Sequence, residues 1–234
     1  VARKVDEIPY DFARRSLAII IADPAEPAAR TLISKGAFDN LLAACDFAKV
    51  DGATRPLDAA TRARLEAFYR ERGEAGFRVL AVGSRQLPMQ PRYTRQDEQH
   101  LTFEGFLLFL DPAKPDAAQT VADLDRMGIA VKIISGDNRY VTAHLGAAVG
   151  LDPKAMLTGR QLAGMRDEAL WHAATRTDLF VEIDPQQKER IVRALQHAGH
   201  AVGYLGDGIN DAPALHAADI GISVNEAVDV ARDS

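Results

Sequence analysis

Two carboxylates and a carboxamide lie close together in the stretch Gly203–Leu215, which reads Gly-Tyr-Leu-Gly-Asp-Gly-Ile-Asn-Asp-Ala-Pro-Ala-Leu. They belong to Asp207, Asn210 and Asp211, and they follow an apolar run, Ala201–Leu205, that we predict to be a strand. Ligands of open α/β sheets bind at the carboxyl ends of the strands. Because Mg²⁺ prefers carboxylate oxygens and retains substrate phosphate in its coordination shell, the pattern predicts a magnesium site with Asp207 and Asp211 as ligands. A glycine-rich turn with solvated acids is the alternative.

Further polar groups follow other predicted strands. Ser135, Gly136 and Asp137 come directly after one apolar run, and Asp111 follows another. Lys188 lies early in a predicted helix. In a parallel sheet the strand ends share one edge, so we expect these groups to converge there with the metal site. A hydroxyl, an ammonium group and a magnesium site are what a transferring phosphoryl group requires.

Strand and helix patterns alternate from Phe103 to Ser234. The expected strands are Phe103–Leu110, Ala130–Ile134, Leu179–Glu182, Ala201–Leu205 and Ile220–Val224. The expected helices are Asp116–Met127, Asn138–Val149, Pro185–His197 and Ala212–Ala218. Such alternation of helices with near-continuous apolar strands is typical of a doubly wound parallel sheet. We therefore expect residues 103–234 to form an α/β domain with a Rossmann-like parallel sheet.

Residues 1–102 lack this strict alternation, and we expect them to form an α+β domain. The expected elements are strands at Ser16–Ala22, Thr31–Ser34 and Phe77–Val82, helices at Phe38–Phe47 and Ala59–Glu74, and a polar loop at Leu87–Leu101. An aromatic ring can stack on a purine and cations can meet phosphates, so Tyr10, Lys35 and Arg78 could line a nucleotide pocket. Taken singly, each residue is more typical of a core aromatic or a solvated charge.

The composition limits the classes of function. The 234-residue chain is 47% hydrophobic and carries a formal net charge of −5, which argues against nucleic acid as a partner. A single cysteine, Cys45, precludes an internal disulfide. No apolar run approaches the roughly 20 residues of a membrane span, and no signal peptide is recognisable. We therefore expect the chain itself to be soluble.

The sequence Gly-Asp-Gly-Ile-Asn-Asp-Ala-Pro-Ala-Leu, residues 206–215, resembles the metal-site motif of the P-type ATPases, which belong to the haloacid dehalogenase-like superfamily. The resemblance implies that Asp207 binds Mg²⁺ and that Asn210 and Asp211 support the phosphate site. Ser-Gly-Asp at 135–137 resembles the family's Thr-Gly-Asp, with the hydroxyl retained. Lys188 matches the family lysine that contacts the phosphoryl group.

The first part of the chain resembles the nucleotide-binding domain of the same family. That domain has an aromatic residue ahead of a basic pair, a Lys-Gly-Ala sequence and a later arginine in a strand. Those positions fall here on Tyr10, Arg15, Lys35 with Gly36, and Arg78. The resemblance implies that Tyr10 stacks on the adenine of ATP and that the cations hold its phosphates. Asp-Pro-Ala-Lys, residues 111–114, is similar to the family's Asp-Pro-Pro-Arg on the nucleotide side, which implicates Asp111 and Lys114.

The family nucleophile, an Asp in Asp-Lys-Thr-Gly-Thr, does not occur in this sequence. We therefore expect a fragment comprising most of the nucleotide-binding (1–102) and phosphorylation (103–234) domains, without the nucleophile strand. Its expected partners are ATP, Mg²⁺ and the remainder of the same pump: nucleophile segment, actuator domain and membrane helices. The resemblance is greatest to the magnesium-transporting type, and it implies a location on the cytoplasmic face of the membrane.

Three alternatives stay open. Asp111 is the only other Asp after a strong apolar strand and could act as a nucleophile, although Ala113 stands where a second Asp or Thr is usual. A soluble haloacid dehalogenase-like phosphatase would need such a nucleophile. A stand-alone nucleotide-binding module would bind ATP without requiring Asp207.

Overall fold

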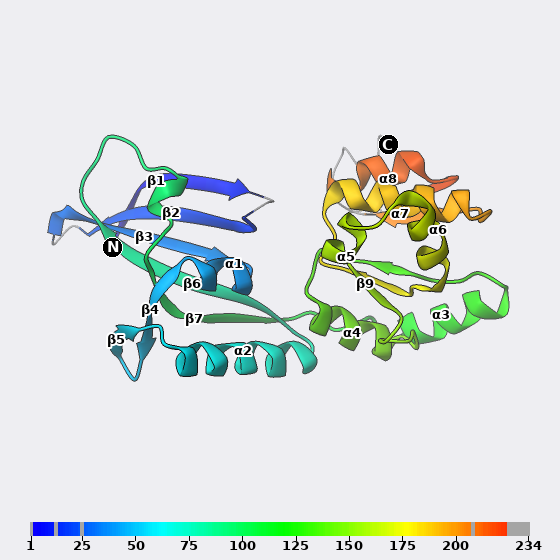
Figure 1. Cartoon of the computed structure of the whole chain (residues 1–234), viewed down its shortest axis with the longest axis horizontal. Coiled ribbons are helices and arrows are strands. Elements are labelled where there is room, and N and C mark those ends of the chain that lie inside the picture. Colours follow the sequence, from blue (N-terminus) through cyan, green and yellow to red (C-terminus); the bar gives the residue numbers. More distant parts are fainter. Residues whose placement is uncertain (1, 12–13, 24–25, 207–208, 224–234) are drawn as a thin grey trace. The chain divides into compact units, whose positions relative to one another are not determined.

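The computed structural model describes residues 2–11, 14–23, 26–206 and 209–223, and the chain divides into two compact units, Val1–Asp111 and Pro112–Ser234 (Figure 1). The sequence placed the boundary between 102 and 103. The difference arises because the expected strand Phe103–Leu110 forms part of β7 (Leu101–Leu110), which pairs antiparallel with β6 (Phe77–Leu87). Backbone pairing along this length ties β7 to the first unit.

The first unit is built on one sheet of seven strands in the order β1-β2-β3-β6-β7-β4-β5. The pairing is antiparallel except between β4 and β7. The remaining strands are β1 (Arg3–Asp11), β2 (Ser16–Asp23), β3 (Glu26–Gly36), β4 (Cys45–Val50) and β5 (Ala53–Pro56). Side chains of a strand alternate between the two faces, so β2 buries Ser16, Ala18 and Ile20 while their neighbours stay partly exposed.

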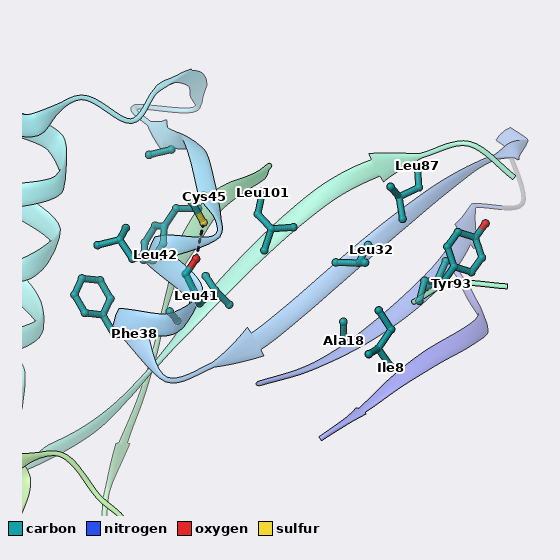
Figure 2. Close-up of a cluster of buried hydrophobic side chains, with 14 residues drawn as sticks. Ile8, Ala18, Leu32, Phe38, Leu41, Leu42, Cys45, Leu87, Tyr93 and Leu101 are labelled. Atoms are coloured by element: carbon teal, nitrogen blue, oxygen red, sulfur yellow. Dashed lines mark hydrogen bonds between the residues drawn. The ribbon is translucent and has the colours of Figure 1, made fainter. Parts of the chain in front are cut away.

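Two helices cover part of the sheet, α1 (Phe38–Ala43) and α2 (Ala59–Glu74). Phe38 of α1 stacks on Tyr69 of α2 with ring centroids 4.5 Å apart, and it also meets Phe106 of β7. Figure 2 shows the core that results, in which Phe38, Leu41 and Leu42 lie with Cys45 and with Leu101 at the start of β7. The Cys45 thiol donates to the Leu41 carbonyl at 3.2 Å.

The expected helix Phe38–Phe47 is wrong in its second half. The helix ends at Ala43, and Cys45 already pairs with Leu101 in the parallel ladder between β4 and β7. Cys45 and Ala48 are buried by this pairing, so tertiary packing overrides the helical spacing of the apolar residues. The polar connection between β6 and β7 is irregular, as expected, apart from a short 3-10 turn at Arg95–Asp97.

The second unit is α/β, and its strands pair in parallel, which confirms the expected fold class. Within the described residues they form two sheets, β8-β10-β9 and β11-β12. These strands are β8 (Ile133–Ile134), β9 (Met156–Thr158), β10 (Leu179–Val181), β11 (Gly203–Gly206) and β12 (Ile220–Ser223). Ile134 and Val202 pack against the core clusters of both sheets, so the two sheets share one interior.

The helices of this unit are α3 (Ala117–Arg126), α4 (Arg139–Ala148), α5 (Gly159–Ala163), α6 (Asp167–Arg176), α7 (Pro185–His197) and α8 (Ala212–Ala217). The sequence predicted α3, α4, α7 and α8 with similar bounds, but β9, α5 and α6 were not predicted. Helix α7 begins where expected because Asp184 caps it, accepting from the Gln187 amide while the Gln187 side chain accepts from the Asp184 amide.

Candidate functional site

Lys188 and Asp211 form a largely buried ion pair in the second unit. Lys188 Nζ donates to Asp211 Oδ1 at 2.6 Å, with 16% and 9% of the two side chains exposed. The Tyr204 hydroxyl donates to the same Oδ1 at 2.8 Å. Lys188 lies at the end of the first turn of α7, Tyr204 on β11, and Asp211 in the 3-10 turn Ile209–Asp211 before α8. The carboxylate therefore joins three elements and holds the ammonium group at a fixed place.

Gly206, the last residue of β11, makes this arrangement possible. A β-carbon at this position would lie 2.7 Å from the Asp211 β-carbon and 3.1 Å from Tyr204 Cε1. Atoms at such distances overlap, so only glycine lets Asp211 close onto the end of the strand. Asn210 is half-buried beside Asp211, and Asp207 lies outside the described residues.

The turn Ser135-Gly136-Asp137 after β8 is fixed to the segment that leads from β10 into α7. Ser135 N–H donates to Phe180 O at 2.8 Å, Ile183 N–H donates to Ser135 O at 3.0 Å, and Glu182 N–H donates to Asp137 O at 2.9 Å. Ser135 Oγ accepts from the Asp137 amide at 3.0 Å, which orients its oxygen. The turn thus lies beside the residues that open α7, the helix that carries Lys188.

Gly136 is exposed between the two polar residues of this turn. A β-carbon there would make only ordinary contact, 3.4 Å from the Ile183 carbonyl oxygen. The structure therefore offers no steric reason for glycine at this position.

In the first unit, the segments carrying Arg15, Lys35 and Gly36 lie side by side. Gly36 pairs with Ser16 across β2 and β3, and Ala37 N–H donates to Arg15 O at 2.9 Å. A β-carbon on Gly36 would lie 2.5 Å from that same oxygen, so the close approach requires glycine. Lys35 is exposed, while Arg15 is half-buried with a positive φ of 50°.

The other two candidate residues of the first unit are Tyr10 and Arg78. Tyr10 lies near this pair of segments, and Arg78 lies further along the sheet. Tyr10 is 51% exposed near the end of β1, next to Asp11, which pairs with Ser16. Arg78 is exposed on β6, four residues before Val82, which pairs with Lys35. Residues an even number apart share a face, so Arg78 and Lys35 lie on one face of the sheet, roughly 13 Å apart along the strand direction.

Asp111 and Lys114 lie in the segment that links the two units. Both are exposed. The expectation that Asp111 shares a sheet edge with Ser135 is wrong, because Asp111 follows β7 of the first unit's mainly antiparallel sheet. Asp111 is therefore not at the tip of a parallel strand, which was the reason to consider it as a nucleophile.

Two residues of these sites were missed by sequence reasoning. The sequence pattern predicts Tyr204 only as part of an apolar strand, yet its hydroxyl contacts Asp211. The sequence pattern predicts a polar loop around Glu98, yet this residue is 7% exposed and paired with Arg14. A loop carboxylate gives no sequence signal of burial, since its cationic partner is distant in the chain.

The described part of the chain holds no group of three or more His, Cys, Asp or Glu side chains able to bind a metal ion. None of the helices in the described ranges has the length and apolarity needed to cross a membrane.

Comparison with known proteins identifies the class. The model of the haloacid dehalogenase-like hydrolases matches residues 24–219, so the chain belongs to this family. Among characterised relatives, the magnesium-transporting ATPase, P-type 1, of Salmonella typhimurium and that of Escherichia coli are each 42% identical over 233 residues. A calcium-transporting ATPase of Bacillus subtilis is 31% identical over 238 residues. Each alignment covers 99% of this chain but 26% of the relative, so the chain spans about a quarter of their length.

Proposed function

We propose that this chain is the nucleotide-binding and phosphorylation part of a P-type cation-transporting ATPase, of the magnesium-transporting kind. The intact pump transfers the γ-phosphoryl group of ATP to an Asp outside this chain and then hydrolyses the aspartyl-phosphate. The observation that carries the proposal is the Lys188–Asp211–Tyr204 cluster at the end of β11, with the Ser135 turn beside the start of the same helix, α7.

The cluster suits a transferring phosphoryl group. The Lys188 ammonium would offset negative charge on the phosphoryl oxygens, and its Asp211 partner holds it in position without reorganisation during the reaction. The Ser135 hydroxyl would donate to another phosphoryl oxygen. The donor set of Asp211, Asn210 and Asp207 consists of oxygens, which is the chemistry that Mg²⁺ favours. Bound there, Mg²⁺ would neutralise phosphate charge.

In the first unit, Tyr10 would stack on adenine, and Arg15, Lys35 and Arg78 would bind the phosphates, with Asp111 and Lys114 on the nucleotide side. The support is the close packing of Gly36 on Arg15 and the exposure of Tyr10 and Lys35. Under this proposal, residues 1–111 are the nucleotide-binding domain and 112–234 belong to the phosphorylation domain.

We further propose that another part of the same pump completes the second unit. Its described parallel strands form two separate sheets, and Leu205, Ile220 and Ile222 of β11 and β12 are 64%, 63% and 48% exposed. Apolar side chains on sheet strands are normally covered. The remainder of the pump would supply the nucleophile-bearing strand, the actuator domain and the membrane helices. The segment with the nucleophile strand would cover these side chains, at the cytoplasmic face of the membrane.

The test is ATP binding and turnover by the purified chain in the presence of Mg²⁺, measured by calorimetry and by phosphate release. ATP should bind, and phosphate release should not exceed that of an Asp207→Ala control. ATP hydrolysis that disappears in the Asp207→Ala control would contradict the proposal that the nucleophile lies outside this chain. Hydrolysis of p-nitrophenyl phosphate by the chain would instead favour a soluble phosphatase of this family.

A reading frame that continues upstream into Asp-Lys-Thr-Gly-Thr would dismiss both the soluble phosphatase and the stand-alone nucleotide-binding module. In the intact pump, Lys188→Ala should abolish formation of the acid-stable phosphoenzyme from ATP. A phosphoenzyme level equal to that of the unmodified pump would refute the role of Lys188.

A further inference from the structure

Glu98 is a buried carboxylate in the connection between β6 and β7. It is 7% exposed, its Oε1 accepts a 2.9 Å hydrogen bond from Ser34 Oγ, and its Oε2 forms an ion pair with the Arg14 guanidinium. Burial of a carboxylate is costly unless it is paired and hydrogen-bonded. Arg14 lies in the turn between β1 and β2, and Ser34 lies on β3, so the two partners of Glu98 are 84 and 64 residues away in sequence.

Both partners immediately precede residues assigned above to the nucleotide phosphates. Arg14 precedes Arg15, and Ser34 precedes Lys35. Ser34 is buried and Lys35 is exposed, because successive residues of β3 face opposite sides of the sheet. Glu98 therefore joins, from the interior, the two segments that carry these cations.

Packing alone does not fix Arg14. Its side chain borders a hollow of about 380 Å³ that is also lined by Ser16, Ser34, Arg95 and Glu98. With open space on one side, the guanidinium is positioned by its polar contacts. These are the Glu98 carboxylate, the Asp11 carboxylate, whose Oδ2 lies 4.0 Å from Arg14 Nε, and contacts at 3.4 Å to Ser16 Oγ and the Pro9 carbonyl.

Glu98 is itself anchored to β1. Arg95 Nη2 lies 2.7 Å from Asp11 Oδ2, and the Tyr93 amide donates to Asp6 Oδ2 at 3.3 Å. Thr94 caps the 3-10 turn that leads into Glu98. The connection is therefore fastened to the strand that ends at the Arg15 turn, and the Glu98 carboxylate has a fixed place from which to act.

We propose that Glu98 is a positioning residue for the triphosphate end of the nucleotide. By pairing with Arg14 and Ser34, it holds the turn that carries Arg15 against the end of β3 that carries Lys35, where both cations can reach adjacent phosphates. The inference rests on the proposed nucleotide function of the first unit. Glu98 itself does not touch the nucleotide.

The test compares ATP with adenosine, using Glu98→Gln in the full 234-residue chain. Gln keeps the shape and an acceptor for Ser34 but loses the ion pair with Arg14. ATP binding should weaken about tenfold in calorimetry, the scale of one charge-assisted hydrogen bond, whereas adenosine affinity should stay within about twofold. A role limited to general stability would weaken both ligands equally, and that result would overturn the proposal.

Glu104→Gln is the matched control. Glu104 also accepts from a serine, Ser84, at 2.6 Å and pairs with a cation, Lys49, at 3.4 Å, but these partners lie on β6 and β4 and not in the segments that carry Arg15 and Lys35. Its ATP affinity should equal that of the unmodified chain. Equal losses in the two variants would also overturn the proposal.

A second measurement separates this inference from the proposed function. Hydrogen exchange of the Ala37 amide reports its bond to Arg15 O, which links the two segments. Exchange at Ala37 should accelerate about tenfold in Glu98→Gln relative to Glu104→Gln at equal global stability. If the unmodified chain binds ATP no better than adenosine, the proposed function fails, and Ala37 exchange alone decides the positioning role. Unchanged exchange refutes it. If Glu98→Gln does not fold, Ser34→Ala, which removes only the hydroxyl, is judged by the same two readouts.

Discussion

Replacing Lys188 with Met tests whether the buried pair with Asp211 is a real structural constraint. Methionine keeps the length of the side chain but leaves Asp211, at 6% exposure, without its cation. Removing one partner of a buried ion pair costs about 3–5 kcal/mol. The Tyr204 hydroxyl still donates to Asp211, and 16% of the Lys188 side chain is exposed, so we expect the lower end, about 3 kcal/mol.

Urea unfolding followed by tryptophan fluorescence measures this loss. The chain has one tryptophan, Trp171, which packs against the core of the second unit and stacks on His197 with ring centroids 4.9 Å apart. Its emission therefore reports this unit alone. With a urea dependence of about 2 kcal/mol per molar, the midpoint should fall by roughly 1.5 M.

Two further variants make the test decisive. In Lys188→Met with Asp211→Asn the buried charge is removed as well, so stability should recover to within about 1 kcal/mol of the unmodified chain. Arg193→Met is the control, because it breaks an ion pair with Glu189 on the same helix. The Arg193 side chain is 60% exposed, so this variant should change the free energy of unfolding by less than about 0.5 kcal/mol. A single variant as stable as the Arg193 control, or a double variant no better than Lys188→Met alone, would refute the reasoning.

Three other outcomes are expected. Gly206→Ala should destabilise the second unit by about 2 kcal/mol in the Trp171 assay, because its β-carbon would overlap that of Asp211 at 2.7 Å; an unchanged midpoint would contradict this. Burial raises the pKa of the Cys45 thiol to about 12, so Ellman's reagent at pH 8 should label it only after unfolding, and rapid labelling of the native chain would disprove the burial. A hydrogen bond from the Thr61 amide lowers the pKa of Asp58 below 3.8. The ionised Asp58 carboxylate therefore stabilises the fold above pH 3.8, and this stabilisation is lost as the pH falls through the lowered pKa. Asp58→Ala should melt at a lower temperature than the unmodified chain at pH 7, and thermal scans should show the difference in melting temperature closing below pH 3.8. A difference independent of pH would exclude this cap as the cause.

The second unit was predictable because its elements carry local signals. Helix α7 has a capping residue, Asp184, and a proline directly after it, and both are visible in the sequence. The Gly-Asp-Gly stretch, which begins at the last residue of β11, indicated the candidate site by its residue types. The pairing of Lys188 with Asp211 depends on a separation of 23 residues closed by the fold, and only the structure shows it.

The first unit was less predictable because its sheet depends on non-local pairing. The sequence of β1 has no regular apolar alternation, and it therefore does not predict a strand. In the structure Ile8 is the only buried residue of β1. β7 was assigned to the wrong unit for a related reason. Its apolar run is compatible with a parallel strand of the second unit, and only its register against β6 settles its place.

The division after Asp111 also bears on how the chain is made. Every strand and helix of the first unit precedes every element of the second, and each unit has its own hydrophobic core. As a ribosome synthesises this stretch, the whole seven-stranded sheet can emerge and close before the α/β elements leave the exit tunnel. The nascent first unit then has no need to wait for later residues, which limits the time during which its β-strands could associate with those of neighbouring chains.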